Sequence, residues 1–337
     1  MRRYFALVSG DSIELARAET EALVRLVASN SRVQWQEKLA IIEAENSPVD
    51  VLIKRAALLK EAGNLVFSGN IDDGILEGLL PTFVQSADTF RVNTISLKNG
   101  VTAQTRTAMT ADVGNRIRRA TGASVSLDSP GVCFTVIMLE EETLVCRSES
   151  SSARMVLKQR KAGKKPFFHP SIMNAHLARA LCNLAQLVSG ETLLDPFCGA
   201  GGIMCEAASL GAKTVGIDLN WKLLRGGKIN LAALDLRETG LVLGDSTHIP
   251  MRGVDCIVTD PPYGRVSSTR GANSVQLVRK LLEQLDCVLS RGGRLCFCGS
   301  EEMNLSGLVS EAGYDMELCV GVRVHSSLVR QVVTVWL

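Results

Sequence analysis

The sequence predicts an α/β protein with an open, Rossmann-like parallel sheet in its C-terminal half and a smaller α+β region before it. From residue 166 onward, short apolar runs alternate with helical patterns, which implies parallel strands joined by right-handed crossovers. Successive strand ends in this half carry a glycine turn or an acidic residue. The N-terminal part instead shows a strand, helix, strand, helix order, which suits a ferredoxin-like half-domain.

The N-terminal elements follow from periodicity. We expect strands at 4–8 and 33–43 and helices at 12–28 and 50–62. A strand near 90, a basic helix at 109–120 and a strand at 132–139 follow. We therefore expect a ferredoxin-like half-domain over 1–68, a second small domain over 69–147, a basic linker over 148–165 and the parallel-sheet domain over 166–337.

In the C-terminal half, a helix is expected at 172–188, before the strand and helix series. The chain closes with strands near 316–324 and 331–337, which we expect to form an antiparallel hairpin.

Composition agrees with a folded protein that works inside the cell. The chain has 337 residues, of which 46% are hydrophobic, enough for two or three domains with real cores. No apolar run reaches the eighteen or so residues of a membrane helix, and the N-terminus enters a strand rather than a signal peptide. We expect a cytoplasmic protein that does not associate with membranes.

The cysteines predict no metal site. There are 10, none in a Cys-x-x-Cys pair, and most lie in apolar runs, such as Cys182, Cys205, Cys256 and Cys287. Cys296 and Cys298 alternate along a strand, which favours core positions. We expect reduced core cysteines and no zinc.

A glycine turn follows the apolar run that ends at Asp195. Gly199 and Gly201 lack the Cβ atoms that would block a ligand, and a helix begins near Ile203 with free backbone N–H groups. A dinucleotide fingerprint needs a third glycine where Met204 stands. The turn therefore fits an S-adenosylmethionine loop better than a nicotinamide site.

Two acids at the next strand ends supply partners for such a cofactor. Asp218 comes about twenty residues after the turn, where a carboxylate can accept both ribose hydroxyls. Asp245 ends the following apolar run and is placed to accept the adenine amino group. In an open parallel sheet, ligands bind at the carboxyl ends of the strands, so these acids should converge.

A fourth strand end carries the motif Asp260-Pro261-Pro262-Tyr263. We assign the Asp260 carboxylate as acceptor of one amine N–H and as route for the proton, and the Pro261 carbonyl as acceptor of the other N–H. Tyr263 would stack on the planar base that bears the amine. The motif therefore predicts methylation of an exocyclic base amine, with the base extruded from its helix.

Basic residues cluster in two stretches that would favour phosphate. The segment from Arg91 to Ala120 contains six basic residues and a single acidic one, Asp112. No acidic residue occurs from Ala153 to Lys165. Nucleic acid, and specifically RNA, is the partner we expect. The candidate phosphate-binding residues are Arg106, Arg116, Arg118, Arg119, Lys158, Arg160, Lys161, Lys164 and Lys165.

Over its C-terminal half the chain resembles class I amino-methyltransferases, and among them archaeal tRNA guanine N2-methyltransferases with an N-terminal THUMP domain. The resemblance rests on Phe168-His169-Pro170, the run from Leu194 to Gly202, Gly244-Asp245, the run from Thr259 to Arg265, and His325 to Arg330. Phe90 to Asn93 and Val125 to Pro130 are similar, more loosely, to a THUMP strand and loop.

The resemblance implies a seven-stranded methyltransferase sheet and the guanosine at tRNA position ten as target, with mono- and dimethyl products. It adds His169, Asp195 and Phe197 to the cofactor residues, which also include Asp260. It adds Pro262, Gly264, Arg265, His325 and Arg330 to the substrate residues. A small activator subunit is a further partner that the sequence leaves open.

Three other functions stay open at this point. DNA adenine methyltransferases share the Asp/Asn-Pro-Pro-Tyr motif but lack a THUMP-like domain, and an rRNA base is a related target. Glutamine methyltransferases use Asn-Pro-Pro-Tyr, and Asp260 argues against that class. A non-catalytic RNA-binding protein could keep the cofactor fold, but the acids at 218, 245 and 260 argue against it.

Overall fold

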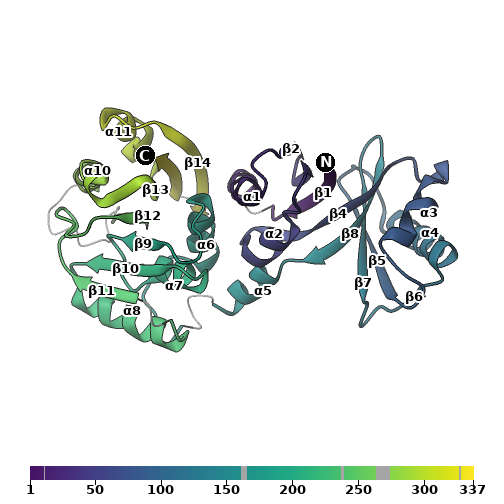
Figure 1. The fold of residues 1–337 in the computed structure, drawn as a ribbon, viewed down its shortest axis with the longest axis horizontal. Helices are drawn as coiled ribbons and strands as arrows, with labels where there is room; N and C mark the ends of the chain where they lie inside the picture. Colours follow the sequence, from purple (N-terminus) through teal and green to yellow (C-terminus); the bar gives the residue numbers. More distant parts are fainter. Residues whose placement is uncertain (11, 161–164, 237–238, 263–273, 326–327) are drawn as a thin grey trace. The chain divides into compact units, whose positions relative to one another are not determined.

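The computed structural model describes the chain except for residues 11, 161–164, 237–238, 263–273 and 326–327 (Figure 1). The chain divides into two compact units. The first comprises Met1–Val8, Val27–Ile53 and Leu59–Ser151, and the second comprises Ser9–Leu26, Lys54–Leu58 and Ser152–Leu337. The chain therefore passes from one unit to the other several times within its first 60 residues.

The first unit is built on an eight-stranded sheet with the order β2-β3-β1-β4-β8-β7-β5-β6. Strands β2, β3, β1 and β4 pair antiparallel, which is the split βαβ strand order expected of a ferredoxin-like arrangement. Its elements are β1 (Arg2–Val8), β2 (Arg32–Gln36), β3 (Leu39–Ala44), α2 (Val49–Arg55), β4 (Leu59–Gly69), α3 (Ile75–Leu79), β5 (Thr89–Ser96), α4 (Ala103–Thr121), β6 (Ser124–Val125), β7 (Val132–Met138) and β8 (Thr143–Ser150).

The second unit is built on a seven-stranded sheet with the order β11-β10-β9-β12-β13-β15-β14, as expected. All neighbouring strands are parallel except β15, which is antiparallel to β13 and β14. Its strands are β9 (Thr192–Asp195), β10 (Lys213–Asp218), β11 (Thr239–Leu243), β12 (Val254–Thr259), β13 (Leu289–Ser300), β14 (Met316–His325) and β15 (Leu328–Trp336). Its helices are α1 (Ile13–Val27), α5 (Ser152–Gln159), α6 (Ala175–Leu184), α7 (Gly202–Ser209), α8 (Trp221–Ala233), α9 (Ser274–Leu282), α10 (Leu285–Val288) and α11 (Leu305–Glu311).

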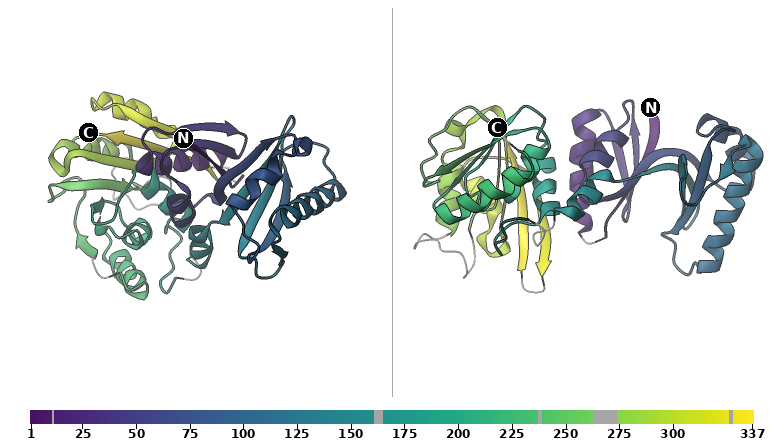
Figure 2. Two further views of the ribbon diagram at one scale, coloured as in Figure 1. Left: turned by 45° about the vertical axis from the view of Figure 1, so that its right-hand side comes forward. Right: turned by 90° about the horizontal axis from the view of Figure 1, so that it is seen from below.

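Both faces of this sheet are buried, because alternate strand residues enter two different cores. Cys256 and Val258 of β12 pack on one face with residues of α6 and α7, whereas Ile257 packs on the other with α9, α10 and α11. The helical layers on either side of the sheet can be followed in Figures 1 and 2. This sandwich fixes the carboxyl ends of β9, β10 and β12 along one edge.

Three local expectations need correction or refinement. The helix expected at 50–62 ends at Arg55, and β4 begins at Leu59 because residues from there on pair with β1. Cys287 was expected in the core but is exposed, because the short helix α10 turns Leu285 and Val288 inward instead. In the stretch expected as a linker, the first residues complete β8 and Ser152–Gln159 form α5.

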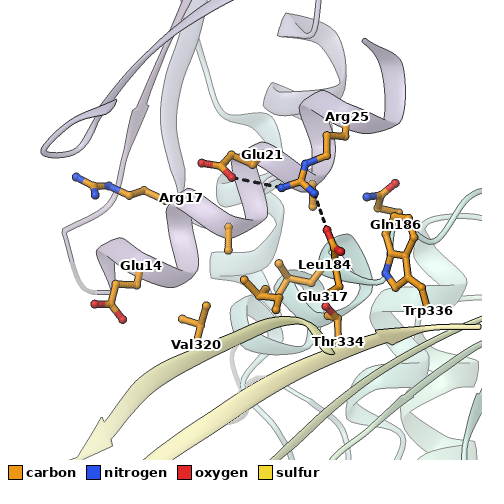
Figure 3. A pocket seen from close by; sticks show the side chains of 13 residues that line it. Glu14, Arg17, Glu21, Arg25, Leu184, Gln186, Glu317, Val320, Thr334 and Trp336 are labelled. Atoms are coloured by element: carbon orange, nitrogen blue, oxygen red, sulfur yellow. Dashed lines mark hydrogen bonds and ion pairs between the residues drawn. The ribbon is translucent and has the colours of Figure 1, made fainter. Parts of the chain in front are cut away.

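Helix α1 belongs to the second unit, where Leu15 and Ala22 enter the same core as α6. Figure 3 shows the side of α1 that lines a groove beside β14, where Arg25 pairs with Glu21 at 3.5 Å and with Glu317 of β14 at 2.9 Å. A groove of about 270 Å³ remains between α1 and the end strands of the sheet. The described part of the chain contains no helix of the length and apolarity that crossing a membrane requires.

The inner side of α1 is fastened by a buried carboxylate. Glu19 accepts hydrogen bonds from the Ala57 and Leu58 amides at 2.8 and 3.0 Å and from Asn183 Nδ2 at 2.7 Å. Arg55 donates to Asn183 Oδ1 at 3.1 Å and to the Leu187 carbonyl at 2.7 Å. Burial raises the pKa of Glu19, and the three hydrogen bonds oppose that rise. The network joins α1 and the segment Lys54–Leu58 to α6.

We predict that Glu19→Ala destabilises the second unit by about 3 kcal/mol, because it leaves two buried amides and an asparagine side chain without their acceptor. Urea unfolding measures the change. Glu21→Ala, which removes the partly exposed pair with Arg25, serves as the control and should cost less than about 1 kcal/mol. Equal losses for the two variants would contradict the assignment of Glu19 as the fastening residue.

Candidate active site

The glycine turn after β9 has the backbone that its sequence predicts. Gly199 and Gly201 adopt φ values of 50° and 75°, in the left-handed region that favours glycine. The Cys198 amide donates to the Ile217 carbonyl at 3.0 Å, which attaches the turn to β10. A Cβ on Gly199 would meet no atom within 4 Å and would project into open space. The turn therefore presents bare backbone at the carboxyl edge of the sheet.

Asp218 lies beside this turn, at the end of β10. Its Oδ2 accepts the Gly199 amide at 2.9 Å, and its Oδ1 accepts the Asn220 amide at 2.7 Å. Each carboxylate oxygen has a second lone pair, so a fixed Asp218 can still accept two hydroxyl groups. The structure thus brings together the turn and the acid that were predicted to share a cofactor.

Exposed apolar side chains stand next to the two acids, and the sequence analysis missed them. Leu219, directly after Asp218, is 44% exposed, and Leu243, two residues before Asp245, is 62% exposed. Large apolar groups exposed at a ligand-binding edge offer surface to a planar ring. For Leu219 the available signal was an apolar residue directly after an acid at a strand end.

Asp245 is exposed and occupies a tight local turn. Its Oδ1 accepts both the amide and the hydroxyl of Thr247 at 2.9 Å. These hydrogen bonds, the backbone one above all, lower the pKa of Asp245. The carboxylate is therefore held ionised and oriented, as an acceptor for an amino group must be.

Asp195 lies beneath the site rather than on its surface, with only 1% of its area exposed. Its Oδ1 accepts the Phe197 amide at 3.2 Å and the Thr259 hydroxyl at 2.7 Å. Burial raises the pKa of Asp195 to about 7, the two hydrogen bonds oppose the rise, and the charges of Asp260 and Asp218 add to it. Asp195 ties the glycine turn to β12.

Asp260 follows β12 at the same edge of the sheet. Its Oδ2 lies 3.5 Å from Arg330 Nη2 of β15, and both side chains are 18% exposed. Pro261 is buried and Pro262 half-buried. Tyr263, Gly264 and Arg265 lie outside the described residues, as does the side chain of His325.

The segment before α6 is attached to α8 by a residue that the sequence analysis did not select. Asn230, which is 1% exposed, accepts the Phe167 amide at 3.0 Å and donates to the Ala200 carbonyl at 3.4 Å. His169 Nδ1 lies 2.7 Å from the Ser171 hydroxyl. Asn230 therefore holds the His169 segment against the glycine turn. A polar residue beside the buried Leu231 was the available signal.

The predicted phosphate-binding residues differ in their ion pairs, hydrogen bonds and exposure. Arg116 pairs with Asp72, Glu77 and Asp112 at 2.8 to 2.9 Å. Arg160 pairs with the buried Glu206 at 3.3 Å, and Arg106 donates to the Val101 carbonyl at 3.3 Å. Arg118, Arg119 and Lys158 are exposed, and Lys165 is half-buried. Lys161 and Lys164 lie outside the described residues.

The strand order with one antiparallel strand, the glycine turn and the acids at successive strand ends define a Rossmann-like methyltransferase of class I. A family profile described as "RMKL-like, methyltransferase domain" matches residues 162–331, half of the chain. The chain belongs to this family. Among the described residues, no group of three or more His, Cys, Asp and Glu side chains could hold a metal ion.

Curated relatives match nearly the whole chain. It is 29% identical to the tRNA (guanine(10)-N2)-dimethyltransferase of Methanothermobacter thermautotrophicus, over 96% of each chain. It is also 29% identical to the enzyme of the same name from Pyrococcus abyssi, over 97% of each. The crystal structure of TrmN from Thermus thermophilus has the same fold, with a TM-score of 0.56 and 21% identity over 99% of each chain.

We predict that Asp195 makes stability fall as the pH rises. The pKa of Asp195 is about 7 in the folded protein and about 3.9 in an unfolded chain. The stability that the protonated carboxyl contributes is therefore complete below about pH 4 and is lost as the pH rises through 7. Asp195→Asn keeps an acceptor oxygen but cannot titrate. Between pH 5 and 7, urea unfolding should show the wild type losing stability relative to this variant, by at most about 1.4 kcal/mol per pH unit. Parallel curves for the two proteins would contradict the raised pKa.

Proposed function

We propose that this protein transfers methyl groups from S-adenosylmethionine to the N2 amine of guanosine in tRNA, at position ten, giving N2-methyl- and N2,N2-dimethylguanosine. The observation that carries the proposal is the position of Asp260, at the same sheet edge as the glycine turn and Asp218. The names of the relatives that match the chain from end to end support the tRNA guanosine as substrate. Such an enzyme works in the cytoplasm, where its tRNA is.

The residues at the sheet edge fit this cofactor. The φ of 50° at Gly199 and the open space where its Cβ would project provide a backbone surface for the ligand. Asp218 would accept the ribose hydroxyls, and Asp245, with the exposed Leu219 and Leu243, would take the adenine. When bound, S-adenosylmethionine supplies a methyl group made electrophilic by the sulfonium charge.

Asp260 would prepare the amine of the substrate. The lone pair of a guanine amine is delocalised into the ring, so the nitrogen must become pyramidal and lose a proton as it attacks. The Asp260 carboxylate would accept one N–H and then the proton, and the Pro261 carbonyl would accept the second N–H. Most of the rate enhancement would come from holding the two reactants in line.

The base must leave its helix to reach this carboxylate. In a tRNA stem the guanine N2 amine lies in the minor groove of a base pair, so flipping would cost a few kcal/mol. Tyr263 would stack on the extruded base. After one transfer the amine keeps one N–H, which permits a second transfer and the dimethyl product.

The first unit, together with the basic residues, would dock the tRNA body as a THUMP-like module. Phosphate contacts position an RNA without reading its sequence, so the choice of guanosine would come from geometry. Arg118 and Arg119 in the last turn of α4, and Lys158 in α5, are the exposed cations for this role. Arg116 would instead stabilise the fold, through its three carboxylates.

Nucleoside mass spectrometry tests the proposed function. Transfer RNA, ribosomal RNA and duplex DNA are each incubated with the purified chain and labelled S-adenosylmethionine, and the products are digested. Label in N2-methylguanosine from tRNA alone is expected. Label in a DNA or rRNA base, or no label even after a cell extract is added, would refute the proposal. Transfer to tRNA that appears only after adding a cell extract would point to an activator subunit.

We predict that Asp260→Ala abolishes transfer but keeps S-adenosylmethionine affinity within a few fold, because the two functions lie at different strand ends. Asp218→Ala is the matched control and should weaken S-adenosylmethionine binding by roughly 1.5 to 3 kcal/mol, the range for a charge-assisted hydrogen bond. Calorimetry and single-turnover transfer measure the two effects. Transfer by Asp260→Ala at more than about a tenth of the wild-type rate would remove Asp260 from the mechanism.

We predict that Arg118→Gln with Arg119→Gln weakens binding of every tRNA alike. Each lost phosphate contact should reduce the slope of log K against log salt by about 1. Filter binding at several salt concentrations measures this slope. Arg279→Gln, which removes an exposed cation paired with Glu311, is the control and should leave the slope unchanged. A double variant with the wild-type slope would exclude α4 from the RNA interface.

A further inference from the structure

Arg330 shares one face of the sheet with Asp260. Cys256 and Val258 of β12, Cys298 of β13 and Val332 of β15 all point into the core on the α6 side. Because side chains alternate along a strand, residue 260 points to the same face as Cys256 and Val258. Residue 330 likewise points to the same face as Val332. Residues 260 and 330 therefore lie on the same face of the sheet, with β13 between their strands, and residue 330 is an arginine, whose side chain is long enough to reach across.

The pairing of β15 with its neighbours fixes the backbone position of Arg330. Arg330 lies opposite Ser300 of β13 and Val322 of β14, so its backbone is held between two neighbouring strands. Its guanidinium Nη2 lies 3.5 Å from Asp260 Oδ2, and only 18% of each side chain is exposed. A pair this far from solvent is screened less than a surface pair.

The surroundings of Asp260 favour a cation. Asp195 at the end of β9 is buried, and the charges of Asp260 and Asp218 help to raise its pKa. This repulsion is mutual, so the charge on Asp195 also disfavours an ionised Asp260. Cys298 faces both partners: burial raises the pKa of its thiol, the Asp260 charge raises it further and the Arg330 charge lowers it. Among the described residues, Arg330 brings a positive charge to an edge where three carboxylates lie.

We propose that Arg330 is a positioning residue, which holds the Asp260 carboxylate in one orientation and in its ionised form for the incoming amine. This role rests on the proposed function and replaces the substrate-binding role that the resemblance implied for Arg330. An ionised Asp260 can accept the N–H hydrogen bond and then the proton of the amine, whereas a protonated one can still accept the hydrogen bond but cannot take up the proton.

The first test reads Asp260 directly and needs no activity. The protein is labelled with carboxyl-¹³C aspartate, and the Asp260 signal is assigned by its loss in Asp260→Asn. In Arg330→Met the Asp260 titration should move upward by about 1 to 3 pH units, the effect of losing an opposite charge at this distance. Arg330→Lys should restore part of the shift. Arg323→Met removes an exposed arginine of the same hairpin and is the matched control.

The second test follows single-turnover transfer to tRNA against pH. The acidic limb of the rate profile should move upward in Arg330→Met, return part of the way in Arg330→Lys and stay in place in Arg323→Met. A lower tRNA affinity with a smaller salt slope, and no movement of the limb, would instead make Arg330 a phosphate contact and overturn the proposal. A lower melting temperature without either pH shift would reduce Arg330 to a structural role.

The two tests separate this proposal from the proposed function. If the wild type transferred no methyl group to tRNA, the proposed function would fail, while the ¹³C titration would still decide whether Arg330 controls the ionisation of Asp260. An unchanged Asp260 titration in Arg330→Met would overturn the proposal even if the wild type methylated tRNA.

Discussion

The buried carboxylate of Asp195 is the interaction on which the site depends. It accepts hydrogen bonds from the Phe197 amide in the glycine turn and from the Thr259 hydroxyl at the end of β12. These two elements carry the cofactor loop and the proposed catalytic acid, so one carboxylate bridges them at the ends of two paired strands. An apolar residue at this position would leave the Phe197 amide without that acceptor.

Placing several acids along one edge has an electrostatic consequence. The charges of Asp260 and Asp218 help to raise the pKa of Asp195, and the three acids have two kinds of partner. Asp218 and Asp195 accept backbone amides, whereas Asp260 faces the guanidinium of Arg330. Hydrogen bonds from the backbone cannot move away, but an arginine side chain can yield to a substrate amine. The acid proposed for catalysis is thus the one with an adaptable partner.

The second unit also draws on the beginning of the chain. Helix α1 and the segment Lys54–Leu58 pack with α6, and Glu19 lies fully buried at their junction. A buried carboxylate is stable only with a complete set of donors, so Glu19 favours one arrangement of these three segments. A methyltransferase unit cut at residue 166 would expose the apolar residues of α6 that α1 covers. The second unit of the structure therefore includes segments that come well before residue 166 in the sequence.

The sequence by itself determined the parallel sheet, the glycine turn and the acids at the ends of β10 and β12, because these features repeat locally. Apolar runs have a strand period, Gly199 needs a left-handed φ, and an acid after a buried strand must lie at the sheet edge. The tertiary structure decided which charges meet. Arg330 stands 70 residues after Asp260 and reaches it only through the antiparallel pairing of β15 with β13. Glu19 and Asn183 are likewise joined by packing, although they stand 164 positions apart in sequence. Contacts at such separations depend on strand order and register, and no local pattern of residues records them.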